Sequence, residues 1–183
     1  GRFEALVRSG RNHLASGDPH RAIVDLRAAI DLWAPPLGGE DVPELRGYVD
    51  RLVANHRVAM TSLMEADVQL GREDLAVLER AIDDDPYDER CWGLLMIALY
   101  RRGRQVEALD AYQRIRRRLV DEFGVEPGPY LRNVEAQILL QSGPDLDARD
   151  GPPVDVVDRA WPARPNRTTP LLCRDDEMRL LRT

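Results

Sequence analysis

Four arginines fall within five residues of one amphipathic stretch, and their side chains could bind a partner. A guanidinium group binds carboxylates and phosphates through paired hydrogen bonds, so the run could contact an acidic protein or DNA phosphates. A helix would also place Asp110, Asp121 and Glu122 four residues from individual arginines, which is the spacing of intrahelical ion pairs. Two interpretations therefore stay open, a partner-binding patch and a solvated helix face with internal pairs. The candidate partner-binding residues are Arg114, Arg116, Arg117 and Arg118.

The acidic run at residues 83–85 is the chief candidate for a metal site. Asp85 immediately precedes Pro86, however, which is the pattern of a helix cap followed by proline at the first helical position. No second cluster at ligand spacing accompanies the run. His56 falls on an apolar helical stripe and is expected in the core, and the other histidines, His13 and His20, show no metal spacing. We expect no metal ligand.

Residues for catalysis are equally scarce. No nucleophile and base stand in an arrangement that the sequence supports, and no glycine-rich loop has the spacing that cradles phosphates. The sequence therefore predicts no catalytic residue, no cofactor-binding residue and no cofactor, and we do not expect an enzyme.

The overall charge and the cysteines limit the class of protein further. The 183 residues have a formal net charge of −6, and all 26 basic residues are arginine. This balance argues against independent DNA binding, which needs a basic face. Cys91 and Cys173 are too far apart for a disulfide framework, and the longest apolar run, residues 94–99, is too short for a membrane span. These features indicate a cytoplasmic protein with no membrane contact.

The apolar residues recur with a helical period almost throughout residues 3–141, which predicts an all-α fold of about seven helices. Glycines at positions 17, 71 and 103 separate helices, and each is followed five residues later by an alanine, Ala22, Ala76 or Ala108. The glycine permits a tight turn and the small alanine permits close helix contact, as in tetratricopeptide repeats. We expect three antiparallel helix pairs and a capping helix in a tetratricopeptide-like, right-handed superhelix. The arginines flanking Gly103 complement a helix dipole in this arrangement (Arg101, Arg102 and Arg104).

The character of the sequence changes after residue 142. Repeated proline and glycine break any helix over residues 143–170, which we interpret as a linker. Residues 171–183 become apolar and charged again. We therefore predict a helical domain at 1–142, a linker at 143–170 and the possible start of a downstream ATPase-type domain at 171–183. The first residue is Gly1, so we expect the chain to be a piece of a longer protein.

Two stretches carry a resemblance to a known family. The first comprises residues 3–11, which read FEALVRSGR, with the Gly-Asp pair at 17–18 and the Leu-Trp pair at 32–33. The second reads DPYDERCWGLLMIALYRRGRQ at 85–105 and continues to EPGP at 126–129. Residues 1–141 thereby resemble the bacterial transcriptional activator domain of the Streptomyces antibiotic regulatory proteins. The resemblance implies a winged helix-turn-helix DNA-binding domain before this one and, in larger members, an ATPase after it. The family's Gly-Arg-Glu trio before that ATPase would correspond to residues 173–175, which read Cys-Arg-Asp.

The resemblance implies an activation domain that works through protein contacts. The expected partners are the DNA-binding domain of the same protein, a second copy of the chain and RNA polymerase, with DNA contacted only through the missing domain. Stacked helix pairs would offer a concave face for a peptide. Two alternatives remain, a relay scaffold within a nucleotide-binding regulator and a free-standing tetratricopeptide adaptor.

Overall fold

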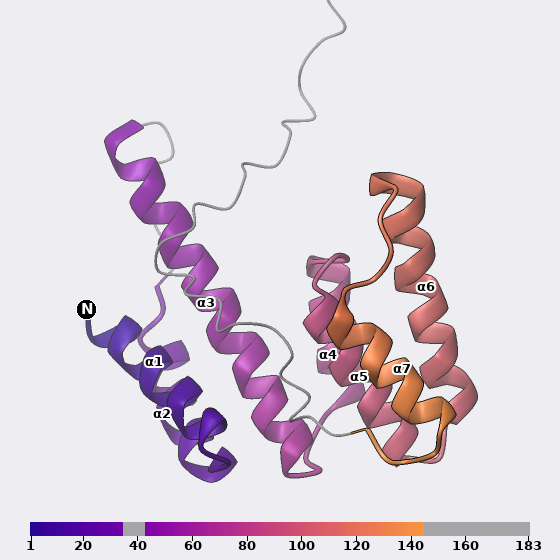
Figure 1. Cartoon of the computed structure of the whole chain (residues 1–183). Coiled ribbons are helices and arrows are strands. Elements are labelled where there is room, and N and C mark those ends of the chain that lie inside the picture. Colours follow the sequence, from indigo (N-terminus) through magenta and orange to yellow (C-terminus); the bar gives the residue numbers. More distant parts are fainter. Residues whose placement is uncertain (35–42, 145–183) are drawn as a thin grey trace, which may run out of the picture.

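Seven helices form the part of the chain that the computed structural model describes, residues 1–34 and 43–144 (Figure 1). Strands are absent from these residues, so the predicted all-α, tetratricopeptide-like fold is confirmed. The predicted linker, apart from residues 143–144, and the segment 171–183 lie outside the described residues. No described helix is both long and apolar enough to cross a membrane. The helices are α1 (Arg2–Ala15), α2 (Pro19–Asp31), α3 (Pro43–Gln69), α4 (Leu75–Asp84), α5 (Glu89–Arg101), α6 (Gln105–Phe123) and α7 (Pro129–Leu139).

Two of the three predicted glycine-alanine turns form helix hairpins as expected. Gly17 and Gly103 have φ angles of 74° and 73°, a left-handed conformation that glycine adopts without steric penalty. Ala22 and Ala108, five residues further, are fully buried where α2 meets α1 and where α6 meets α5. The small side chains therefore set close helix approach at both hairpins.

The third predicted hairpin is wrong. Gly71 does end α3 with a φ of 65°, but α4 packs along α5 and is not closely packed against α3, and Ala76 is exposed. Two arginines at the end of α5 explain the difference. Arg101 donates a hydrogen bond to the carbonyl of Val68 at the end of α3, and Arg102 donates one of 2.8 Å to the carbonyl of Glu73. These bonds hold the α3–α4 connection against α5, a more specific role than complementing a helix dipole.

The start of α5 also differs from the prediction. Asp88, not Asp85, caps the helix, and its carboxylate accepts hydrogen bonds from the backbone N–H groups of Arg90 and Cys91. Asp85 instead ends α4 and forms an ion pair of 3.1 Å with Arg57 of α3. The helix begins three residues after Pro86 because the better-placed cap is the aspartate that follows the turn.

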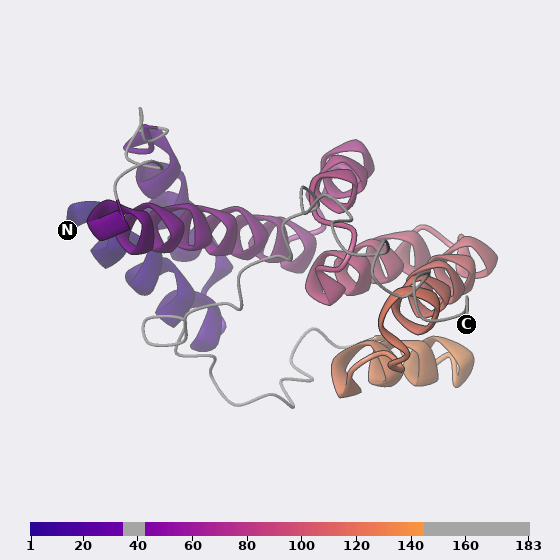
Figure 2. The same cartoon turned by 90° about the horizontal axis from the view of Figure 1, so that it is seen from above.

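The apolar side chains form two cores joined by α3. One core combines α1 and α2 with Ala59 and Ala66 of α3, and the other combines α4 to α7 with Met64 and Val68 of α3. Helix α5 lies at the centre of the second core, in contact with α3, α4, α6 and α7 (Figure 2). Residues 91–99 of α5 are all buried as a result, so this helix presents no open concave face to a peptide.

Candidate partner-binding surface

Helix α6 positions the four candidate arginines. Its apolar residues recur every three or four positions and are buried against α5 and α7 (Ala108, Ala111, Tyr112, Ile115 and Leu119). The side chains between them point outward by helical geometry, and all four arginines are exposed. Gly124, with a φ of 68°, ends the helix directly beyond them. The structure therefore brings the candidates together on one helix but not on one face.

Arg116 separates from the other three arginines. At 3.6 residues per turn, it lies on nearly the opposite side of α6 from Arg114. Its guanidinium binds the Glu126 carboxylate with two hydrogen bonds of 2.7 Å. The hydrogen bonds from Arg116 lower the pKa of Glu126, although burial opposes the shift. Arg116 is therefore engaged within the domain and fixes the loop that follows α6.

The other three arginines line a shallow hollow on the surface of α6, together with Asp121 and Glu122. We call these five residues the arginine hollow. The predicted internal pairs are not formed here, because none of the three arginines lies within 4.0 Å of a carboxylate among the described residues. Arg117 donates instead to the Gln113 carbonyl at 3.2 Å.

Two neighbouring aromatic residues shape the hollow. The Arg114 guanidinium lies over the Trp92 ring, 5.1 Å from its centroid, a cation–π contact that orients the group. Glu122 accepts a hydrogen bond from the hydroxyl of Tyr87, so this carboxylate has a partner outside α6. The hollow thus presents three guanidinium groups at one end and two carboxylates at the other.

The other charged candidates serve the fold. Among the described residues, no three histidine, cysteine or acidic side chains gather in a way that could hold a metal ion. His56 is half-buried and stacks on Trp33 with ring centroids 4.3 Å apart, and burial lowers its pKa. His13 lies 3.5 Å from Asp25 of the next helix.

The sequence did not predict a buried polar cluster that lies between α3, α5 and α7. Arg90 forms an ion pair of 2.6 Å with Glu65 of α3 and lies over the Tyr130 ring of α7, 4.4 Å from its centroid. Tyr130 fits against Gly93, where a β-carbon would stand 2.6 Å from the tyrosine hydroxyl oxygen. The glycine inside an otherwise apolar helix was the available signal, because such a glycine marks close approach of a neighbour.

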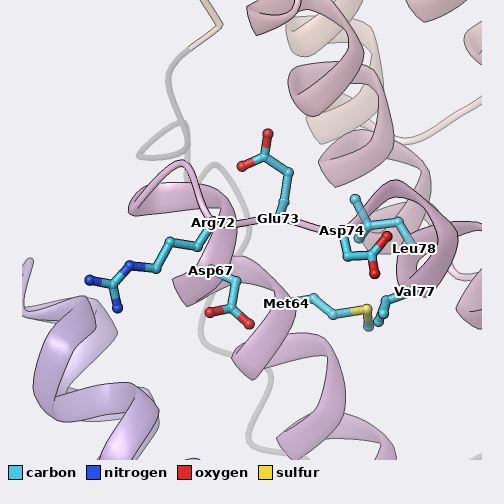
Figure 3. A pocket seen from close by; sticks show the side chains of 7 residues that line it. All are labelled: Met64, Asp67, Arg72, Glu73, Asp74, Val77 and Leu78. Carbon is cyan, nitrogen blue, oxygen red and sulfur yellow. The ribbon is translucent and has the colours of Figure 1, made fainter.

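A small pocket lies at the connection between α3 and α4 (Figure 3). Burial raises the pKa of Asp67 on its wall. The carboxylates of Asp67, Glu73 and Asp74 point in different directions in Figure 3, so they do not converge on a common ligand. Aliphatic groups from Met64, Val77 and Leu78 complete the wall with Arg72. The pocket is part of the joint between two helices, and the arginine hollow is the better candidate for binding.

Comparison with known proteins places the whole helical body in one family. Residues 1–139 match the family model described as bacterial transcriptional activator domain. EmbR, a transcriptional regulatory protein of Mycobacterium tuberculosis, is 35% identical over 153 residues, which cover 81% of this chain and 39% of that protein. RedD, a transcriptional regulator of Streptomyces coelicolor, is 37% identical over 144 residues, or 76% of this chain and 41% of that protein.

The solved structures give the same relationship. The structure of Mycobacterium tuberculosis EmbR in complex with a low-affinity phosphopeptide matches with a TM-score of 0.68 and 35% identity, over 77% of this chain and 38% of that chain. The regulatory protein DnrI of Streptomyces peucetius is 33% identical over 85% of this chain and 58% of its own length. The present chain therefore corresponds to about two fifths to three fifths of these relatives. The chain belongs to the bacterial transcriptional activator domain family, and the relatives named above are regulators of the Streptomyces antibiotic regulatory protein type.

Proposed function

We propose that this chain is the protein-interaction and activation module of a transcription regulator, and that the arginine hollow is its contact with an acidic partner. DNA would be bound by a winged helix-turn-helix domain elsewhere in the same protein. The observation that carries the proposal is the set of three exposed guanidinium groups without a carboxylate within 4.0 Å among the described residues. Guanidinium groups without a carboxylate partner can form charge-assisted hydrogen bonds with the carboxylates of another protein.

The structure favours the outer surface of α6 over a concave groove. A peptide in a tetratricopeptide groove needs open side chains on the inner helices, and residues 91–99 of the central helix are buried. The carboxylates of Asp121 and Glu122 within the hollow would repel DNA phosphates. Both points favour a protein partner that offers acidic side chains.

The proposed partners are the DNA-binding domain of the same regulator, a second copy of this module and RNA polymerase. The family match and the regulator names of the relatives support this class over a free-standing adaptor. They also support binding rather than catalysis as the task of the domain, and the cytoplasm as its place of action. The alternative function is a relay to a downstream nucleotide-binding domain, and no feature of the described residues favours it.

A transcription reporter tests the proposal. The chain is fused to a heterologous DNA-binding domain, and reporter output is measured for wild type and for Arg114→Glu/Arg117→Glu/Arg118→Glu. Each exposed ion pair contributes roughly 0.2–1 kcal/mol, so the reversal of all three charges should weaken partner binding by about tenfold or more. Output should fall accordingly, while the protein level and the circular dichroism spectrum stay unchanged.

A matched control changes the same number of charges elsewhere. Arg8, Arg51 and Arg80 are exposed and lie on three other helices, α1, α3 and α4. Their simultaneous reversal to glutamate should leave the output near the wild-type level. Equal loss of output in both triple variants would mean that net charge, and not the arginine hollow, governs activation.

A further inference from the structure

The arginine hollow has a polar order along α6. Arg114, Arg117 and Arg118 come first, and Asp121 and Glu122 follow about one turn later. A ligand that matches the hollow therefore carries acidic groups followed, along the same direction, by basic groups. A uniformly anionic ligand such as a phosphate backbone fits only the arginine end.

The chain itself contains a segment with the matching order. Residues 175–177 are Asp-Asp-Glu, and they are followed by Arg179 and Arg182. Aligned in the same direction as α6, the three acidic side chains correspond to the three arginines of the hollow, and the two arginines correspond to Asp121 and Glu122. The acidic run at 83–85 has no such match, because it belongs to the folded body and Asp85 is already paired with Arg57.

The segment is long enough to reach the hollow of its own molecule. The end of α7 lies beside the start of α6, because Gln105 donates a hydrogen bond to the carbonyl of Ile138. From there, the arginines are nine to thirteen residues along α6, or roughly 14–20 Å at 1.5 Å per residue. Residues 145–170 can span several times that distance when extended, at about 3.3 Å per residue.

We propose that residues 171–183 dock on the arginine hollow of the same chain, through Asp175, Asp176 and Glu177 against Arg114, Arg117 and Arg118, and so occupy the surface that an outside acidic partner needs. This inference rests on the proposed function of the hollow. It adds that residues 171–183 compete with the outside acidic partner for the same three arginines. Tethering gives the segment a local concentration on the order of millimolar, which favours its docking over the binding of a free copy of the same segment.

Paramagnetic NMR on the full 183-residue chain tests the docking. A nitroxide is attached to Cys173, which lies within the docking segment. Cys91 is buried and its pKa is raised to about 12 by burial, so it stays unlabelled; a Cys173→Ser variant checks this. The backbone amide signals of residues 114–122 should be broadened, and those of α1 should not. Salt at about 1 M, where the screening length is roughly 3 Å, should remove the broadening.

Two variants separate specific docking from general attraction. Asp175→Asn/Asp176→Asn/Glu177→Gln should abolish the broadening. Asp145→Asn/Asp147→Asn/Asp150→Asn changes the net charge equally outside the docking segment and should leave it intact. None of the six positions belongs to the seven described helices, so a failure to fold does not confuse the result.

Three outcomes would overturn the inference. They are no broadening at the hollow, broadening that survives neutralisation of residues 175–177, and broadening that appears only between copies when spin-labelled and isotope-labelled chains are mixed. The last result would assign the hollow to self-association. The measurement needs no outside partner, so it can fail while the reporter result holds, and the reporter result can fail while docking is observed.

Discussion

The Tyr130 side chain of α7 packs directly against Gly93 of α5 in the second core. Glycine is unfavourable within a helix by about 1 kcal/mol relative to alanine, yet Gly93 lies in the middle of α5 with eight other buried residues. The tyrosine ring fills the space that a β-carbon would take and also carries the Arg90 guanidinium on its face. Glycine is therefore favoured at position 93 despite its cost in a helix, because the Tyr130 ring of α7 occupies the space beside it.

Replacing this glycine tests the fit. Gly93→Ala should lower the free energy of unfolding by about 1–3 kcal/mol, the usual range for overpacking, because the displaced ring is itself mostly buried. Gly47→Ala is the control, since Gly47 lies in α3 and a β-carbon at this position would have no neighbouring atom within 4 Å. It should leave the domain unchanged or stabilise it by up to about 1 kcal/mol. Urea unfolding followed by circular dichroism measures both. Equal stability of the two variants would contradict the assigned contact.

The Cys91 thiol gives a second test at the scale of one residue. Burial raises its pKa to about 12, with the neighbouring Asp88 carboxylate as a further cause. The thiolate is the reactive form, so at pH values near 8 the folded chain holds almost none at this position. In a Cys173→Ser variant, alkylation should be negligible in the native state and rapid in denaturant. Fast native-state labelling, followed by mass spectrometry, would show that the thiol is accessible.

At the scale of helices, the α5–α6 hairpin depends on a small residue at its contact. Ala108 is fully buried where the two helices meet, whereas Arg117 is exposed. Ala108→Leu should destabilise the domain by about 1–3 kcal/mol, and Arg117→Ala should change stability by no more than about 0.5 kcal/mol. Thermal unfolding of both variants decides the matter. An unchanged melting temperature for Ala108→Leu would refute the close helix contact.

At the scale of the whole molecule, the charge balance predicts weak DNA binding. The net charge is −6, and the three arginines of the hollow stand next to two carboxylates. The chain should bind duplex DNA only non-specifically, with a dissociation constant of roughly 10⁻⁴–10⁻⁶ M at physiological salt. Gel-shift titrations on unrelated duplexes at two salt concentrations measure this. Sequence-selective binding that resists salt would contradict this prediction and show that this domain itself recognises DNA.

The sequence by itself determined the helices and the family. Helical periodicity, the turn glycines and the long motif around residues 85–105 are local signals, and the all-α fold and the family match agree with them. The Asp18 cap of α2 and the proline at the first position of α7, Pro129, are local features of the same kind, because a helix start involves neighbours in the chain. The segments beyond residue 144 remain predictions.

Only the tertiary structure decided how the helices meet and which arginines of α6 have a carboxylate partner. The α3–α4 hairpin failed because Arg101 and Arg102, some thirty residues away, bind the α3–α4 connection. The expected ion pairs along α6 failed because Arg114 lies over Trp92 and Glu122 bonds to Tyr87, both from other parts of the chain. Spacing along a helix shows which groups can meet, but competing partners from distant segments determine which of them do.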